Sequence, residues 1–199
     1  MITAVILAAG ESRRMSAFKP LLPFGESTVL ETVLANHQSA GMLTTFVVVG
    51  HNHQRIEEVV EPLGIPSILN EDYLDGMFSS AVAAVEFFDR MRPHPEGVLF
   101  ALVDQPAIPN LIIRQVKDAF VLDPHRIVLP TYFGRRGHPV IFPWSIVREI
   151  PAYDGRGGLK GFRDLHANLI LEVPVNEGAV LRDMDSPRDY EAELKRKKK

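Results

Sequence analysis

Near its start the chain reads Val5-Ile6-Leu7-Ala8-Ala9-Gly10-Glu11-Ser12-Arg13-Arg14-Met15-Ser16-Ala17-Phe18-Lys19-Pro20-Leu21-Leu22-Pro23, an apolar strand that runs directly into a turn of small residues. Ala8, Ala9 and Gly10 leave the backbone uncovered, so that successive N–H groups can point toward an anion. Arg14 and Lys19 follow and can neutralise its charge. The segment therefore predicts a nucleoside triphosphate site at the exit of a buried strand. The alternative is a core strand followed by a solvated basic loop.

Composition limits the classes of protein to consider. The chain has 199 residues, of which 46% are hydrophobic and 24% charged, values typical of an ordinary globular protein. This length suits a single domain over residues 1–199 with a core of its own. The net charge of -3 argues against a surface that coats nucleic acid. Because there is no cysteine, any metal ion must be held by oxygen or imidazole ligands.

The two ends of the chain predict a cytoplasmic location. No basic leader precedes the first strand, and the apolar run breaks at Gly10, well short of a membrane span. The lysine-rich end, residues 195–199, is interpreted as a solvated helix end rather than as a membrane or nucleic-acid patch. We therefore expect neither a membrane nor a nucleic-acid partner.

Strand and helix patterns alternate along the chain, which predicts an α/β fold with three layers, a mostly parallel sheet with helices on both faces. The expected strands are residues 2–7, 46–49, 67–69, 97–103, 126–129 and 169–173. The expected helices are residues 28–40, 54–60, 78–90, 110–121, 144–150 and one that opens at Ser186. Loops are expected over 130–143 and over the glycine-dense stretch 154–161, although the end of the first loop leads into a strand.

A carboxylate follows the expected central strand, in Leu102-Val103-Asp104-Gln105-Pro106. Ligands of such sheets bind beyond the carboxyl ends of the strands, so Asp104 and the loop after the first strand should share one rim. A partly buried aspartate needs a positive partner, and Mg²⁺ suits a carboxylate that faces a triphosphate. The alternative is that Asp104 caps the helix that begins near Pro109.

A second acidic segment is Asp183-Met184-Asp185-Ser186-Pro187. In an extended chain, alternation sends Asp183 and Asp185 to one face and Met184 to the other. Either carboxylate could reach a metal ion, and we favour Asp185 because it lies nearer the helix start. The alternative is that both aspartates only complement the helix dipole.

The order of Gly10, Ser12, Arg14, Met15 and Lys19 resembles the pattern LAAGxSxRMGxxK. This pattern belongs to nucleotidyltransferases related to molybdenum cofactor cytidylyltransferase, within the Rossmann-like fold of nucleoside-diphosphate-sugar transferases. Ser16 departs from it, because the family usually has glycine there. LVDQP and the segment with Asp183 and Asp185 are similar to the two metal-site segments of the family, and the resemblance covers nearly the whole chain.

The resemblance implies roles for individual residues. Arg14 and the backbone around Gly10 would hold the triphosphate, Lys19 would lie near the α-phosphate, and Asp104 with Asp185 or Asp183 would hold Mg²⁺. Lys19, Arg14 and Asp104 are thus the expected catalytic residues. The expected nucleotide-binding residues are Leu7, Ala8, Ala9, Gly10, Ser12, Arg14, Lys19, Asn70, Gly76 and Ser80.

Residues 70–80 are similar to the family's N-x-x-x-x-x-G-M-x-x-S segment, in which glycine backbone and serine hydroxyl contact the base. Gly76 and Ser80 match these positions, although Ser79 or Ser80 could instead be a helix N-cap. Ala9 bears on the choice of base, because the resemblance associates alanine with cytidylyl transfer and glycine with guanylyl transfer.

The expected acceptor site lies in two further segments. Residues 135–142 look like the family's G-x-x-x-G-H-P-V segment and supply Arg136 and His138, although Pro139 could give His138 a purely structural role. Residues 155–160 resemble G-D-x-G-A-R and supply Gly158 and Lys160. Arg156 replaces the acid expected there, which reverses the charge at one position.

Other residues offer no chemistry of their own. Ser12 has no His and Asp pattern that would make it a nucleophile. His37 falls on the apolar stripe of its helix and is interpreted as a core residue. The remaining histidines outside the acceptor segment lack metal-ligand spacing; they are His51, His53, His94, His125 and His166.

The predicted function is magnesium-dependent transfer of CMP from CTP to a phosphate on a small acceptor, with release of pyrophosphate. By resemblance the acceptor is molybdopterin with its molybdenum, and the product would pass to a molybdoenzyme or chaperone. One alternative is guanylyl transfer or a sugar-phosphate acceptor. Another is a nucleotide-binding module without catalysis, which the presence of both Lys19 and Asp104 disfavours.

Overall fold

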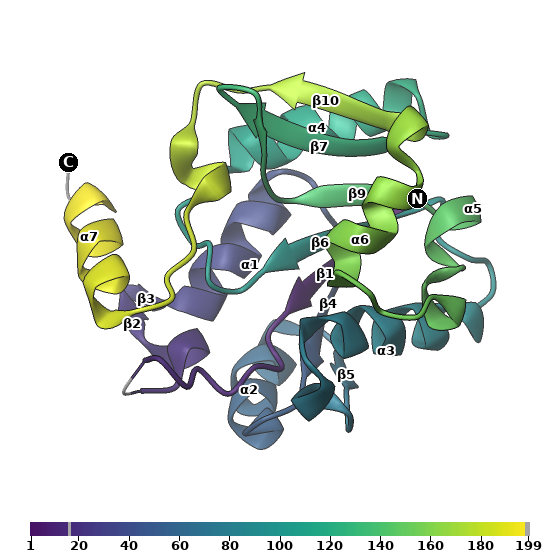
Figure 1. The fold of residues 1–199 in the computed structure, drawn as a ribbon. Helices are drawn as coiled ribbons and strands as arrows, with labels where there is room; N and C mark the ends of the chain where they lie inside the picture. Colours follow the sequence, from purple (N-terminus) through teal and green to yellow (C-terminus); the bar gives the residue numbers. More distant parts are fainter. Residues whose placement is uncertain (16, 198–199) are drawn as a thin grey trace.

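The computed structural model describes residues 1–15 and 17–197 and confirms the expected fold class. Its sheet has the strand order β10-β7-β9-β6-β1-β4-β5, with β8 paired to β7 (Figure 1). Ser16, where the sequence departs from the family pattern, and the last residues of the lysine tail lie outside the described residues. Within the described residues, no helix is long and apolar enough to cross a membrane.

Most strand pairs are parallel, and β6, the expected central strand, lies in the middle of the sheet beside β1. In the part of this sheet that the structure describes, β8 and β9 are the strands that run antiparallel to their neighbours. The register pairs Leu7 with Leu102, so that β1 and β6 end level with each other. The strands are β1 (Ile2–Leu7), β4 (Thr45–Val49), β5 (Ser67–Leu69), β6 (Gly97–Leu102), β7 (Ile127–Tyr132), β8 (Arg135–Arg136), β9 (Val140–Pro143) and β10 (Ile170–Pro174).

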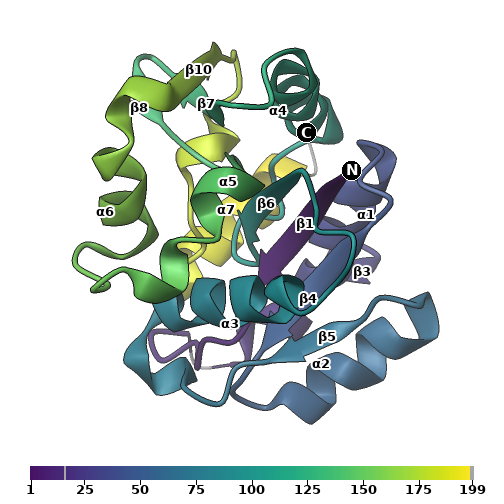
Figure 2. The same cartoon turned by 90° about the vertical axis from the view of Figure 1, so that its right-hand side faces the viewer.

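Helices cover both faces of the sheet (Figure 2). One face is covered by α1 (Val29–Ser39), α2 (His53–Val60) and α4 (Asn110–Leu122). The other is covered by α3 (Met77–Asp89), α5 (Trp144–Val147) and α6 (Gly158–Leu165). Alternate residues of β1 enter the two cores, Ile6 into the first and Leu7 into the second.

The C-terminal helix α7 (Pro187–Lys197) stands to one side of the sheet, at the left of Figure 1. It lies beside a small hairpin formed by β2 (Pro23–Phe24) and β3 (Ser27–Thr28). This hairpin comes directly before α1, whose N-terminus is closed by a capping box between Thr28 and Glu31.

Two expected loops contain regular structure. In the stretch 130–143, β7 extends to Tyr132 and turns through Phe133 and Gly134 into β8. Phe133 has a φ of +47° and Gly134 of +72°, the left-handed pair that a tight hairpin turn requires. An asparagine or aspartate before the glycine would have indicated this hairpin, and phenylalanine does not.

The glycine-dense stretch 154–161 was expected to be a loop throughout. This expectation is wrong, since α6 begins at Gly158. Gly161 lies in the first turns of α6, where a Cβ atom would come within 2.0 Å of the carbonyl oxygen of Arg156. This glycine therefore allows a close approach of two backbone segments rather than a flexible loop.

Candidate active site

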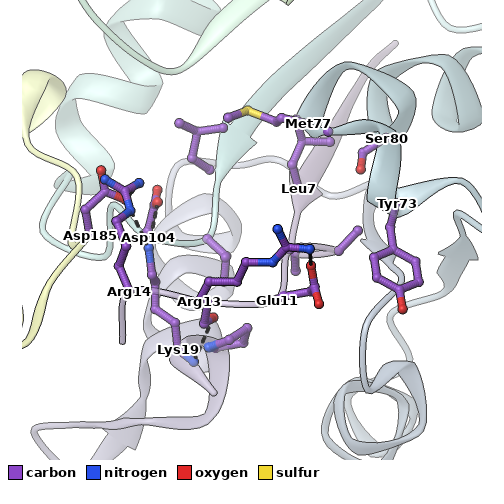
Figure 3. A pocket seen from close by; sticks show the side chains of 18 of the residues that line it. Leu7, Glu11, Arg13, Arg14, Lys19, Tyr73, Met77, Ser80, Asp104 and Asp185 are labelled. Atoms are coloured by element: carbon purple, nitrogen blue, oxygen red, sulfur yellow. Dashed lines mark hydrogen bonds and ion pairs between the residues drawn. The ribbon is translucent and has the colours of Figure 1, made fainter. Parts of the chain in front are cut away.

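A cavity of about 420 Å³ opens where β1 and β6 end (Figure 3). It lies at the expected rim, beyond the carboxyl ends of two neighbouring parallel strands. Its wall is formed by the loop after β1, the start of α3, the end of β6 and one residue before α7. The lining residues are Leu7, Ala8, Ala9, Gly10, Glu11, Ser12, Arg13, Arg14, Lys19, Pro20, Tyr73, Leu74, Gly76, Met77, Ser80, Leu102, Val103, Asp104 and Asp185.

Ser12 shapes the loop after β1. Its φ of +56° is left-handed, and its side-chain oxygen accepts a hydrogen bond from the backbone N–H of Lys19 at 3.1 Å. The carbonyl oxygen of Ser12 accepts a second bond from the N–H of Met15 at 2.8 Å. These two hydrogen bonds make Ser12 fix the position of the Lys19 backbone beside the cavity. The sequence did not indicate this role.

Charged side chains from distant parts of the chain meet at one end of the cavity (Figure 3). The Nζ atom of Lys19 lies 3.0 Å from Oδ2 of Asp104 and 3.5 Å from Oδ1 of Asp185. Arg14 contacts the same Oδ1 of Asp185 at 2.9 Å. Lys19 is only 8% exposed. The two cations and two carboxylates thus compensate one another at this end of the cavity.

Asp104 has one carboxylate oxygen without a partner. Burial raises the pKa of its carboxyl group, and the neighbouring Lys19 ammonium opposes this shift. Lys19 takes Oδ2, whereas Oδ1 is buried and makes no hydrogen bond. Helix α4 has Pro109 at its N-cap and no side-chain cap, so Asp104 does not cap that helix.

The carboxylate oxygens at the charged end of the cavity are suitable ligands for a hard divalent cation. Oδ1 of Asp104 is a carboxylate oxygen in need of a positive partner, and Asp185 lines the same cavity. Within the described residues, no group of at least three His, Cys, Asp or Glu side chains is arranged to hold a metal ion. Mg²⁺ commonly binds with few carboxylates and completes its shell with phosphate oxygens and water.

The two aspartates before α7 diverge. Met184 is fully buried and its N–H donates to the carbonyl oxygen of Asp104 at 3.0 Å. Asp183 accepts a hydrogen bond from Nε2 of Gln105 at 2.6 Å and does not line the cavity, whereas Asp185 does. The expectation that both aspartates point to one site is therefore wrong, because only Asp185 lines the cavity.

Tyr73 and Ser80 line the opposite end of the cavity, and Met77 lies between the two ends (Figure 3). Gly76 occupies the N-cap position of α3, so neither Ser79 nor Ser80 is that helix's N-cap. Asn70 lies behind this wall, where its Nδ2 donates to the hydroxyl oxygens of Ser79 at 2.8 Å and Ser80 at 3.0 Å. Asn70 thus orients serines instead of lining the cavity.

Ala9 is only 4% exposed and packs at the same end. A Cβ atom added at Gly50 would lie 2.9 Å from the methyl carbon of Ala9 and 2.7 Å from Cβ of Tyr73. Gly50 therefore permits the close contact that places Tyr73 beside the loop after β1. The sequence analysis did not identify Gly50 or Tyr73. The signal available was the position of Gly50 directly after a buried strand, where a glycine often allows a close contact.

The expected acceptor residues lie outside this cavity. Arg136 is paired with Glu172 at 2.8 Å and Asp164 at 3.6 Å. Gly158 and Lys160 lie in the first turn of α6. His138 donates its backbone N–H to Val180, burial lowers the pKa of its ring, and its buried Nδ1 has no partner.

Known proteins similar to this chain agree with the presence of a nucleotide site. The family described as MobA-like NTP transferase domain matches residues 4–170. The chain belongs to this family. It is a nucleotidyltransferase, with a Rossmann-like fold shared by solved nucleotidyltransferases.

Among sequence relatives of this NTP transferase, the molybdenum cofactor cytidylyltransferase of Escherichia coli is 28% identical over 95% of the chain and 93% of the relative. A protein of Paenarthrobacter nicotinovorans named nicotine blue oxidoreductase is 30% identical over 93% and 92%. The solved structure of Rv0371c from Mycobacterium tuberculosis in complex with manganese covers 98% of the chain and 97% of that protein, with a TM-score of 0.76 and 28% identity.

The NTP transferase match ends before the segment that carries Asp185. The matched part supplies Arg14, Lys19 and Asp104, while the C-terminal segment supplies the second carboxylate of the charged end. The site is therefore completed by residues beyond the matched domain.

Proposed function

We propose that this nucleotidyltransferase transfers CMP from CTP to a phosphate of a small acceptor, that molybdopterin bearing its molybdenum is this acceptor, and that Mg²⁺ assists. One observation carries the proposal: Lys19 contacts Asp104 and Asp185 in the cavity that is also lined by the exposed backbone at Gly10. A cation, a carboxylate with one unpartnered oxygen and backbone N–H groups beside Gly10 suit a metal–triphosphate complex. The N–H of Ala8, which the sequence suggested for this role, instead donates to the carbonyl oxygen of Val48 at 2.9 Å.

In the proposed reaction, an oxygen of the acceptor phosphate attacks the α-phosphorus in line and forms a new P–O bond. The bond between the α-phosphorus and its bridging oxygen breaks, and pyrophosphate leaves with the electron pair. Arg14 and the N–H groups around Gly10 bind the phosphates, and Lys19 stabilises negative charge at the α-phosphate. Asp104 and Asp185 would hold Mg²⁺, which neutralises phosphate charge when bound.

Two observations support the choice of base and acceptor. Ala9 packs beside Tyr73 at the end of the cavity opposite the charges, where a base would lie. The relative from Escherichia coli is named for cytidylyl transfer to the molybdenum cofactor, which supports both CTP and molybdopterin here.

The test is pyrophosphate release with CTP, GTP, UTP or ATP, each with and without molybdopterin loaded with molybdate, in the presence of Mg²⁺. We expect release that requires the acceptor and is fastest with CTP. Preference for GTP would contradict cytidylyl transfer, and absence of release with all four nucleotides would contradict the proposed function.

A further inference from the structure

Helix α7 connects the two sides of the charged end of the cavity. It begins directly after the segment with Asp185, and it contacts the hairpin that follows Lys19. We propose that Tyr190 and Glu193 on α7 are positioning residues that set the geometry between Lys19 and Asp185. This inference rests on the proposed function for its catalytic meaning, and it concerns residues beyond the matched family domain.

The first contact fixes the chain that follows Lys19. The hydroxyl of Tyr190 donates a hydrogen bond to the carbonyl oxygen of Pro23, and Nζ of Lys197 donates to that of Phe24 at 2.7 Å. Lys197 also lies 4.5 Å from the centre of the Phe24 ring, a cation–π contact. The short helical turn Lys19–Leu21 leads into this hairpin after one residue, so a shift of the hairpin would be felt at Lys19.

The second contact fixes the chain around Asp185. The side chain of Glu193 is only 4% exposed and accepts a hydrogen bond from Nε of Arg182 at 2.8 Å. Arg196, one turn later on α7, pairs with the same carboxylate. Buried carboxylates are costly unless paired, so this group ties the chain before Asp183 to α7.

The start of α7 is fixed by its own cap. The N–H of Ser186 donates to Oδ2 of Asp189 at 2.8 Å, and its hydroxyl donates to the same oxygen at 2.7 Å. Asp185 is thus held on both sides, by Arg182 through Glu193 and by the capped helix start. The Tyr190 contact links α7 to the hairpin after Lys19, and the Glu193 contact links α7 to the segment before Asp185. Helix α7 therefore connects the two chain segments that carry the Lys19–Asp185 pair.

A displacement of about 1 Å between catalytic groups can lower the reaction rate roughly a hundredfold. The base end of the cavity contains none of the α7 contacts, so nucleotide affinity should change less than turnover. We therefore expect Tyr190→Phe and Glu193→Gln each to lower kcat by roughly fivefold or more, with KM for the nucleotide within about twofold. Glu191→Gln is the matched control, because Glu191 lies exposed on the same helix.

A second measurement does not depend on activity. Reductive methylation followed by mass spectrometry reports how accessible each lysine is. We expect Lys19, buried and paired, to react several times faster in Tyr190→Phe and Glu193→Gln than in wild type or Glu191→Gln. Lys117, whose Nζ donates to Ala40 at 2.8 Å far along the chain, reports global unfolding and should react at its wild-type rate.

Unchanged methylation of Lys19 in both variants, or unchanged kcat per folded molecule, would overturn the inference. Equal acceleration at Lys19 and Lys117 would also overturn it, because α7 would then only stabilise the fold. If wild type releases no pyrophosphate, the proposed function fails, while the methylation pattern still decides whether α7 positions Lys19.

Discussion

Nζ of Lys19 lies 3.0 Å from Oδ2 of Asp104, although 85 residues separate them in the chain. The parallel register of β1 and β6 brings the two segments together, since Leu7 is level with Leu102. Lys19 compensates only one oxygen of the buried carboxylate and leaves Oδ1 without a partner. Under the proposed function, Oδ1 would meet a metal ion and Lys19 a phosphate, and such preorganised charge is what a catalytic site needs more than a simple binding module does.

Substitution of Lys19 tests the phosphate role. We expect Lys19→Met to lower kcat by roughly a hundredfold or more, because it removes the donor that stabilises charge at the α-phosphate. Circular dichroism should show a native fold, since methionine keeps the apolar part of the buried side chain. Lys195→Met, at an exposed position of α7, is the control and should leave kcat unchanged. Wild-type kcat in Lys19→Met would refute this role.

Asp104→Asn tests the metal role. The amide keeps the shape of the side chain but binds Mg²⁺ and Mn²⁺ poorly, so metal-dependent activity should fall below detection while the fold persists. Calorimetric titration with CTP should show that Mn²⁺ strengthens CTP binding in wild type and in Asp118→Asn, an exposed control on α4, but not in Asp104→Asn. If activity per folded molecule stays normal, Asp104 has a structural role only.

The two aspartates before α7 should behave differently. Asp185 contacts Lys19 and Arg14, whereas Asp183 accepts a hydrogen bond from Gln105 outside the cavity. We expect Asp185→Asn to raise the Mg²⁺ concentration needed for half-maximal activity by roughly tenfold or more, as loss of one metal ligand should. Asp183→Asn should raise it less than threefold. The reverse order would assign the second metal ligand to Asp183.

Much of the fold could be predicted because the alternation of apolar runs and amphipathic stretches is strong. The strands 2–7 and 67–69 were predicted at the bounds that the structure has. The hairpin at Phe133 was missed, because its left-handed turn carries no asparagine signal. Helix α6 was missed because Gly158 and Gly161 usually indicate a loop, and here the second glycine serves close backbone packing.

The charged end of the site could be anticipated from strand exits, because adjacent parallel strands end at one rim. What sequence could not supply was the direction of each side chain. Asp183 and Asp185 were treated as near equivalents, whereas Asp183 accepts a hydrogen bond from Gln105 outside the cavity and Asp185 lines the cavity. Likewise, the contact between Gly50 and Tyr73 joins segments whose distance in space depends on the whole sheet.

Ala9→Gly tests the choice of base. The methyl group of Ala9 packs at the end of the cavity formed with Tyr73, so its removal leaves room for a larger base. One methyl group is worth ~1–3 kcal/mol in such discrimination, so the preference for CTP over GTP should weaken without reversing. The ratio of kcat/KM for the two nucleotides in both proteins measures this. An unchanged ratio would exclude Ala9 from base selection.

His37 should make stability depend on pH. It is 4% exposed, its Nδ1 bonds to the carbonyl oxygen of Val33 at 2.8 Å, and its buried Nε2 has no partner. Burial lowers the pKa of the ring from 6.5 to about 4. Between these values the unfolded chain binds a proton that the folded chain does not. Stability from this group is therefore complete above about pH 6.5 and is lost as the pH falls toward 4.

The free energy of unfolding should thus fall by about 3 kcal/mol between pH 7 and pH 4 through His37 alone, since each unit of pKa shift corresponds to about 1.4 kcal/mol. His37→Leu removes the titrating group and keeps an apolar side chain in the core, so urea unfolding at both pH values should show a fall smaller by this amount. His125→Leu, at an exposed position, should retain the wild-type fall. An equal fall in His37→Leu and wild type would show that other groups cause the pH dependence.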